Sequence, residues 1–191
     1  MRSLVTSASN PEAMDLSAAY TGDELVPDAN MVYNQLITVS ASAEEVFPWI
    51  VQLGKGRGGW YLTTQVERIF PRAWRATRRV EPQWQSIVPG DRVEDYGFDA
   101  SQDYFIVAAK SPPTELVYQS DTYGCSFTWA LLLHESVDRA ETVVHLRFRG
   151  KIQATGVKRW CILTGGEWMD WLSTRPMLAG LKERVERAHR D

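Results

Sequence analysis

The stretch from residue 91 to residue 152 most restricts the fold that this chain can adopt. It contains five short segments of alternating or β-branched character, at 91–96, 102–109, 114–120, 123–134 and 141–152. Residues that favour reversals separate these segments, such as Pro112-Pro113 and Val137-Asp138-Arg139. Strands this close in sequence pair with one another, because a parallel connection needs a long crossover. The stretch therefore predicts an antiparallel meander.

Helices and one more strand are predicted on either side of this meander. Residues 33–39 alternate and favour a first strand. Ser42 and Glu45 form a capping-box pattern that starts a helix, which Gly54 ends. A second short helix is predicted at 64–70, and a long one at about 165–190. The long helix has an apolar stripe at steps of three and four: Trp168, Trp171, Leu172, Arg175, Leu178, Leu181 and Val185.

The order of these elements predicts an α+β helix-grip fold. In this fold a curved antiparallel β-sheet wraps around a long C-terminal helix, with two short helices after the first strand. The grip leaves an internal cavity between helix and sheet. Hydrophobic residues make up 44% of the 191 residues, which suits one globular domain. We expect residues 1–31, which are polar, to form an N-terminal arm and residues 32–191 to form a ligand-binding domain.

Charge and motif content exclude several classes of function. The net charge is −3, so no overall basic field favours nucleic acid or an anionic membrane as a partner. The three His and two Cys show no metal-ligand spacing, and no nucleotide fingerprint or nucleophile elbow is present. We therefore expect neither a metal nor an organic cofactor. With no targeting segment visible, we expect a cytoplasmic protein that is a monomer or a homodimer.

Five stretches together resemble a known superfamily. They are 41–53 (ASAEEVFPWIVQL), 54–61 (GKGRGGWY), 88–93 (VPGDRV), 127–133 (FTWALLL) and 177–184 (MLAGLKER). In order and local pattern they resemble the START-like (SRPBCC) superfamily, which includes Bet v 1 and the polyketide cyclase/dehydratase group. The resemblance extends from about residue 33 to 188. It implies the helix-grip fold and a hydrophobic small-molecule ligand, in a superfamily that includes carriers, hormone receptors, cyclases and isomerases.

Strand alternation predicts which side chains line the cavity. The bulky face of each strand should point toward the helix. From the strands, the predicted wall is Tyr118, Tyr123, Cys125, Phe127, Trp129, Leu146 and Phe148, to which the C-terminal helix adds Trp168, Trp171 and Leu172. His145, Arg147 and Arg149 alternate with the apolar residues, so we expect them on a solvated opposite face. If that strand is phased the other way, these three residues form a polar cavity wall.

The aromatic content has two interpretations. The chain has 8 Trp, 7 Tyr and 6 Phe, which either fill a core or line a pocket for an aromatic or polycyclic ligand. Within such a pocket, Tyr118 and Tyr123 are candidates to orient a carbonyl or phenol, and Asp121 is a candidate general base. Arg175 is a candidate partner for an enolate or carboxylate. The alternatives are that Asp121 is only a turn residue and that Arg175 extends outward.

The glycine-rich loop at 54–61 is a candidate entrance rather than a phosphate site. It lacks P-loop spacing and follows a helix instead of a strand. We expect Arg57 to organise the loop or gate the cavity, with Trp60 and Tyr61 near the entrance. Trp74 and Trp84 are further candidates for the mouth. The arginines at 72–79 are either a solvated helix face or a contact for an acidic partner.

The leading hypothesis, which the resemblance to the START-like superfamily mainly implies, is a small-molecule enzyme of the cyclase, dehydratase or isomerase type. It would hold a hydrophobic metabolite in the cavity in a reactive conformation and move one proton. The alternative is a non-catalytic carrier or sensor of a similar ligand. A third hypothesis is a protein-binding module that uses the 72–79 segment.

Overall fold

A computed structural model describes residues 14–96, 99, 101–122, 124–138, 140–152 and 174–190. The elements before the meander are the 3-10 turn η2 (Asp23–Leu25), strand β1 (Met31–Val39), helices α1 (Ala43–Val51) and α2 (Thr64–Glu67), and the 3-10 turns η3 (Arg72–Trp74) and η4 (Pro82–Trp84). The meander consists of β2 (Arg92–Glu94), β3 (Tyr104–Ser111), β4 (Glu115–Thr122), β5 (Cys125–Glu135) and β6 (Thr142–Ile152). A C-terminal helix covers residues 174–190.

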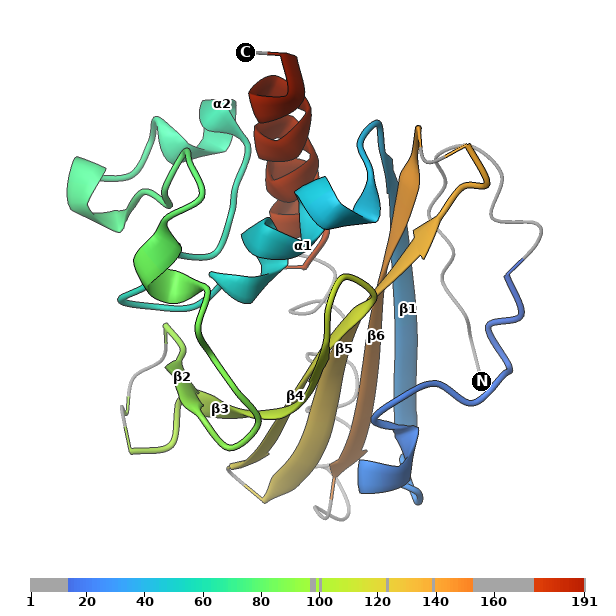
Figure 1. The fold of residues 1–191 in the computed structure, drawn as a ribbon. Helices are drawn as coiled ribbons and strands as arrows, with labels where there is room; N and C mark the ends of the chain where they lie inside the picture. Colours follow the sequence, from blue (N-terminus) through green and yellow to red (C-terminus); the bar gives the residue numbers. More distant parts are fainter. Residues whose placement is uncertain are drawn as a thin grey trace.

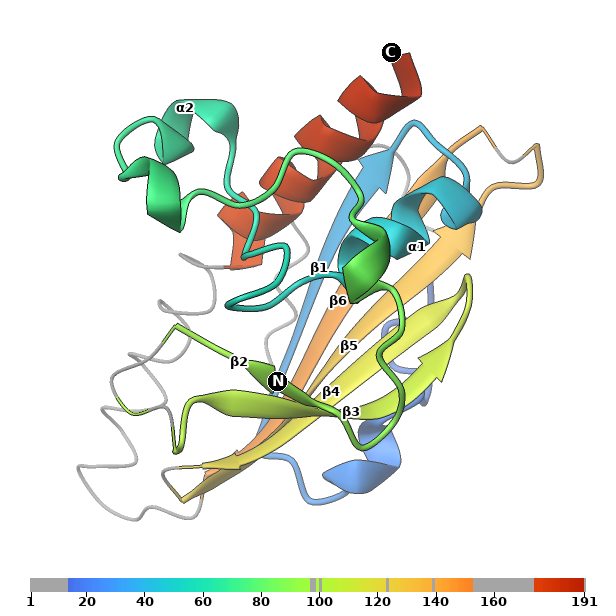
Figure 2. The same cartoon turned by 60° about the vertical axis from the view of Figure 1, so that its left-hand side comes forward.

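The six strands form one antiparallel sheet in the order β1-β6-β5-β4-β3-β2 (Figure 1). The meander predicted from the sequence is confirmed, and β1 joins it by pairing with the last strand, β6. The helices α1 and α2 and the C-terminal helix lie on one side of the curved sheet in both views (Figures 1 and 2). We call this side the inner face and the opposite side the outer face. The helix-grip class is confirmed by this arrangement.

Local sequence explains the short helices. The capping box at the start of α1 is formed, because the Ser42 hydroxyl accepts from the Glu45 backbone N–H and the Glu45 carboxylate accepts from that of Ser42. The helix α2 ends at Glu67, earlier than predicted. After Glu67 the backbone N–H groups of Ile69 and Phe70 donate to the carbonyls three residues earlier, so the chain tightens into turns before Pro71.

The C-terminal helix supplies part of the hydrophobic core. Leu178, Leu181 and Val185 from its predicted stripe are buried with residues of α1 and the sheet. Gly180 allows the helix to approach the chain closely, because a Cβ there would lie 2.6 Å from the Leu62 carbonyl carbon. The part of the helix predicted before residue 174 lies outside the described residues.

The outer face is covered by the N-terminal segment 14–30, which corrects one prediction. His145 and Arg147 do lie opposite the apolar residues of β6, but they are 0% and 4% exposed rather than solvated. Arg147 forms a bidentate ion pair with Asp23, with Nε–Oδ1 and Nη2–Oδ2 distances of 2.8 and 2.9 Å. Arg149 donates to the backbone carbonyls of Val26 and Pro27. The prediction was wrong because strand alternation cannot reveal that a distant segment covers this face.

The same segment completes a polar cluster around His145. The ring of Tyr20 packs edge-on against His145, with centroids 5.0 Å apart. The Asn34 amide oxygen lies 2.8 Å from His145 Nε2 and accepts from Arg147 Nη1 at 3.0 Å. Burial, together with the nearby charges of His134 and Arg147, lowers the pKa of His145 to about 4. His145 is therefore neutral at physiological pH and part of the packing beneath the segment.

Candidate ligand-binding cavity

A cavity of about 680 Å³ lies between the inner face of the sheet and the segment that contains α2 and η3. Most of its lining is apolar, which is typical of sites for small organic ligands. Among the described residues, nine aromatic side chains contribute to the wall: Tyr33, Trp60, Phe70, Trp74, Tyr96, Phe105, Phe127, Trp129 and Phe148. Polar contributions come from Glu67, Asp95 and Lys151.

Strand alternation builds the aromatic wall as the sequence predicted. Trp129 on β5 and Phe148 on β6 are register partners, so both point to the inner face. The rings of Phe105 and Trp129 are stacked, with centroids 5.5 Å apart and an interplanar angle of 19°. Trp60 meets both of these rings edge-on, at 5.9 and 5.8 Å. The wall therefore consists of rings that pack against one another.

The glycine-rich loop holds Trp60 against this wall. Gly54 pairs with Gly59, and Lys55 pairs with Glu94 of β2, so the loop folds back onto the sheet. Gly54 has a φ of 124°, and a Cβ there would lie 2.3 Å from a methyl carbon of Val93. The glycines thus serve a tight turn with close packing.

Asp95 is the carboxylate of the cavity wall that sequence reasoning missed. Its Oδ1 accepts from Trp60 Nε1 and from the Tyr96 backbone N–H, each at 2.7 Å. Burial raises the pKa of Asp95, as does the neighbouring Asp103, whereas these two hydrogen bonds and the charge of Lys55 lower it. Strand alternation could have indicated this position, because Asp95 follows the buried Val93 by two residues and so shares its face of the sheet.

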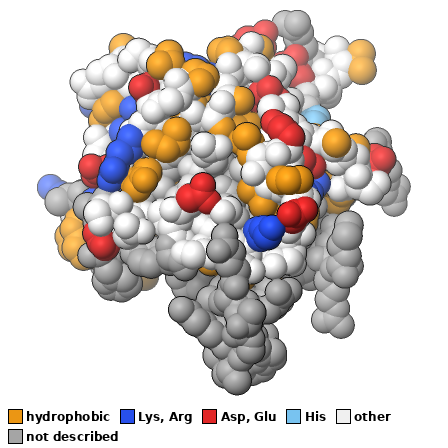
Figure 3. Space-filling view, turned by 90° about the horizontal axis from the view of Figure 1, so that it is seen from below, with side chains coloured by type: hydrophobic (Ala, Val, Ile, Leu, Met, Phe, Trp, Pro, Cys, Tyr) orange, Lys and Arg blue, Asp and Glu red, His pale blue; other side chains and the backbone are white. Residues whose placement is uncertain are grey.

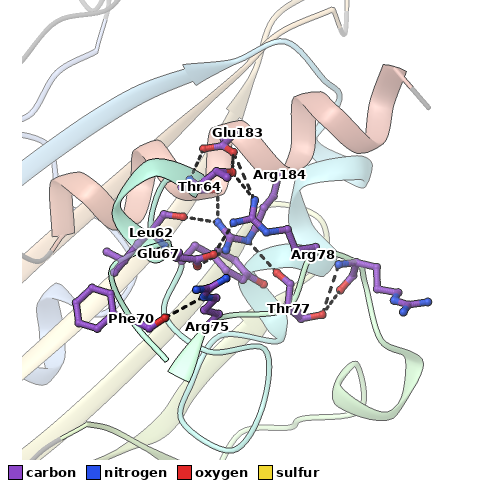
Figure 4. A network of polar contacts seen from close by, with 12 residues as sticks. Leu62, Thr64, Glu67, Phe70, Arg75, Thr77, Arg78, Glu183 and Arg184 are labelled. Atoms are coloured by element: carbon purple, nitrogen blue, oxygen red, sulfur yellow. Dashed lines mark hydrogen bonds and ion pairs between the residues drawn. The ribbon is translucent and has the colours of Figure 1, made fainter. Parts of the chain in front are cut away.

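The other acidic residue of the wall is Glu67, and each of its carboxylate oxygens forms an ion pair with an arginine. Its carboxylate receives both Arg184 from the C-terminal helix and Arg78, the latter at 2.5 Å (Figure 4). Arg184 also donates to the backbone carbonyls of Leu62 and Thr77, at 2.7 and 2.8 Å. These contacts fasten the α2 segment to the C-terminal helix, so Glu67 stabilises the cavity roof rather than offering a free charge.

The arginines at 72–79 were predicted to form a solvated helix face or a contact for an acidic partner. Two of them instead organise the chain locally. Arg75 donates to the carbonyls of Phe70 and Arg68, and Arg78 binds Glu67 and Glu183. Figure 4 shows these side chains converging below the C-terminal helix.

Arg57 organises its loop, as one of its two predicted roles required. Its Nη2 donates to the backbone carbonyls of Val51 and Trp84, at 3.1 and 2.6 Å. Burial lowers the pKa of this guanidinium. Its side chain does not line the cavity. Trp84 does not line it either, whereas Trp74 does and is 67% exposed at the mouth.

Two tyrosines expected near the ligand belong to the core instead. The Tyr61 hydroxyl donates to the Trp49 carbonyl and accepts from Gln52 Nε2, both at 2.8 Å. Tyr118 is 0% exposed and packs on Phe105, and its hydroxyl has no hydrogen-bond partner among the described residues. Burial raises the pKa of both phenols. Neither side chain lines the cavity.

The remaining predicted site residues divide into three groups. Asp121 is exposed and has the outer-face phase of β4, and Arg175 is exposed on the C-terminal helix, so the structure brings neither to the cavity. Tyr123, Trp168, Trp171 and Leu172 lie outside the described residues. The structure does bring together Trp60, Cys125, Phe127, Trp129 and Phe148.

The described residues contain neither a candidate membrane span nor a candidate metal site. None of the helices in this part of the chain is long and apolar enough to span a membrane. Within the same residues, His, Cys, Asp and Glu side chains form no group of three able to hold a metal ion. On the face seen from below, acidic, basic and hydrophobic side chains are intermixed (Figure 3).

Comparison with known proteins gives similarity in solved structures alone. No family model and no curated protein matches the sequence. A protein from Nitrosospira multiformis is 14% identical, with 84% of this chain and 100% of that chain covered at a TM-score of 0.46. A START superfamily protein from Mycobacterium smegmatis is 12% identical, with 82% and 98% covered at 0.42. A protein from Arthrobacter aurescens is 12% identical, with 82% and 86% covered at 0.47.

Proposed function

We propose that the protein binds a hydrophobic small molecule, such as a polyketide-, terpenoid- or aromatic-like metabolite, in the cavity of the inner face. The observation that carries this proposal is the cavity itself, which is about 680 Å³ in volume and is lined by nine aromatic side chains of the described part of the chain. Its volume lies within the range typical of small-molecule sites, roughly 300–1,000 Å³. A rigid wall of rings favours flat or polycyclic apolar ligands.

Packing elsewhere in the molecule supports a binding role for this space. Protein interiors are normally filled, and an unfilled apolar cavity costs stability. Leu116, Leu131 and Leu146, on the same strands as the wall residues, are 0% exposed. The sheet thus packs tightly beside the cavity, and a ligand would supply the contacts that the protein lacks within it.

Native mass spectrometry of the purified protein tests this proposal. We expect a bound apolar molecule of small mass, or uptake of such molecules from a panel of polycyclic metabolites. The Phe127→Ala variant should retain less of the bound molecule than wild type, because Phe127 lines the cavity. Absence of binding across the panel would overturn the proposal.

Catalysis is a second candidate function, favoured by Asp95. A carboxyl group whose pKa is raised by burial is suited to giving or taking one proton. The reaction would then be a cofactor-free cyclisation, dehydration or isomerisation in secondary metabolism, with the ligand oriented by the aromatic wall. The other predicted acid–base residue, Asp121, lies on the outer phase of its strand.

The Asp95→Asn variant distinguishes the enzyme hypothesis from the carrier or sensor hypothesis. If the protein is an enzyme, this substitution should abolish turnover and leave ligand affinity almost unchanged. A carrier predicts that wild type shows no turnover of any ligand it binds. Product analysis by liquid chromatography and mass spectrometry, after incubation with the ligands found above, distinguishes the two outcomes.

A further inference from the structure

Asp95 differs from the other charged groups at the cavity because one of its two carboxylate oxygens has no hydrogen-bond partner among the described residues. Oδ1 accepts two hydrogen bonds, from Trp60 Nε1 and from the Tyr96 backbone. Among the described residues, no Lys or Arg forms an ion pair with Asp95, and no hydrogen bond reaches Oδ2. The half-buried side chain therefore presents an acceptor oxygen to an apolar space.

The remaining charged groups at the cavity are already paired. Glu67 is bound by Arg78 and Arg184. Lys151 forms an ion pair with Asp28 at 2.9 Å and has the outer-face phase of β6. Asp95 is thus the charged side chain among the described wall residues that is left to interact with a ligand.

The charges around Asp95 favour a positive ligand group over a negative one. Asp103 adds a second carboxylate nearby that raises the pKa of Asp95, and among the described residues the basic group that acts on it is Lys55, whose charge lowers that pKa. The ammonium of Lys55 lies 5.9 Å from the centre of the Tyr96 ring, and the ion pairs found among the described residues do not include one between Lys55 and Asp95. A carboxylate ligand at this point would face repulsion and would lose hydration without gaining a partner.

Aromatic rings beside a carboxylate also suit a cation. Trp60 holds Asp95 in place and borders the same cavity as Trp129 and Phe105. Ring faces attract ammonium groups, most strongly for Trp and most strongly where water is excluded. A ligand cation between Asp95 and these rings would gain both interactions, and would offset the cost of burying the carboxylate.

We propose that the ligand is a hydrophobic amine whose protonated nitrogen pairs with Asp95 while its apolar body lies against the aromatic wall. This inference rests on the proposed binding function and specifies the chemical class of the ligand. It favours a carrier or sensor over an enzyme that uses Asp95 as its base, because the ion pair would occupy the carboxylate oxygen and make it a weaker proton acceptor.

Three matched probes with one apolar body test the inference. Pyrenemethylamine, pyrenemethanol and pyrenecarboxylic acid are cationic, neutral and anionic at neutral pH. Binding is followed through energy transfer from Trp emission to pyrene. We expect wild type to bind the amine about tenfold more tightly than the alcohol, a difference of about 1.4 kcal/mol, and to bind the acid most weakly.

Two variants assign the preference to Asp95. Asp95→Asn keeps an oxygen that can accept from Trp60 and should lower affinity for the amine to that for the alcohol, with the alcohol unaffected. Glu94→Gln is the matched control, because Glu94 is the exposed neighbour on β2 and its removal takes away one negative charge outside the cavity. This control should keep the full preference for the amine.

The outcomes distinguish the inference from the function on which it rests. If no probe binds wild type, the proposed binding function fails. If all three bind with equal affinity, or if Asp95→Asn keeps the preference for the amine, binding stands and the amine inference is overturned. Unfolding of each variant, followed by circular dichroism, shows whether a loss of affinity reflects a loss of folded protein.

Discussion

The two faces of β5 and β6 use alternate residues of the same strands in opposite ways. On the inner face, Trp129 and Phe148 are apolar and border a cavity. On the outer face, His145 and Arg147 are polar and buried beneath segment 14–30, with Arg147 paired to Asp23. The apolar inner face borders the cavity, whereas the polar outer face is covered by the segment 14–30. Hydrophobicity therefore does not by itself indicate which face of a sheet is filled.

The largest expected effect on stability comes from breaking the outer-face ion pair. Arg147→Ala removes a side chain that binds Asp23, Asn34 and the Leu16 carbonyl. Loss of one partner of a buried ion pair costs about 3–5 kcal/mol, because the other charge stays buried. Urea unfolding measures this loss. A change below about 1 kcal/mol would show that segment 14–30 contributes little to stability.

A matched pair of substitutions on β5 sharpens the comparison. Leu132 is buried on the outer face and Trp129 borders the cavity on the inner face. Leu132→Ala should lower the free energy of unfolding by about 2–5 kcal/mol and leave ligand affinity unchanged. Trp129→Ala should weaken binding of pyrenemethanol about tenfold, a loss of about 1.4 kcal/mol. Equal effects of the two variants on binding would contradict the division between the faces.

The outer face should also make the protein sensitive to acid. The pKa of His145 is lowered from 6.5 to about 4 in the folded protein, so the unfolded chain binds the proton first as the pH falls. The free energy of unfolding should therefore decrease between pH 6.5 and pH 4, by at most about 3.5 kcal/mol at about 1.4 kcal/mol per pKa unit.

Denaturant unfolding across this pH range measures the acid effect. His145→Gln removes the titrating ring and should flatten the dependence. His189→Gln is the control, because His189 is exposed and pairs with Glu45 at the surface. A wild-type free energy that stays constant between these pH values would contradict the buried state of His145.

The smallest effect is expected for the exposed pair of the same segment. Lys151 and Asp28 form an ion pair at 2.9 Å, with side chains that are 43% and 75% exposed. Exposed pairs contribute about 0–1 kcal/mol, so Lys151→Ala should change the free energy of unfolding within this range. A loss as large as that of Arg147→Ala would mean that burial does not determine the contribution of these pairs.

Strand alternation made much of the inner face predictable from the sequence. It placed Phe127, Trp129 and Phe148 in one wall, and spacing predicted the antiparallel order of the strands. The wall residues Tyr33 and Phe105 follow the same rule, yet their role depends on which positions of neighbouring strands lie side by side. Register of this kind is set by tertiary pairing, which local pattern does not contain.

Burial of polar groups was the part that the sequence could not reveal. Asp23 is 124 residues from Arg147, so nothing in the local pattern of β6 indicated a covered face. Asp95 and Asp121 are both aspartates near strand ends, and only the fold shows that the first meets the cavity. Tyr118 was correctly assigned to the inner face but lies in the filled core. Alternation assigns a face, and packing depth needs the structure.

A fluorescence titration of wild type with pyrenemethanol tests the central claim, that the inner face holds a cavity for a hydrophobic ligand. Trp60 and Trp129 border the cavity, so a probe bound there should quench Trp emission and saturate at one molecule per chain. Trp129→Ala should weaken this saturable binding. Quenching that never saturates, or that is unchanged in Trp129→Ala, would contradict the account.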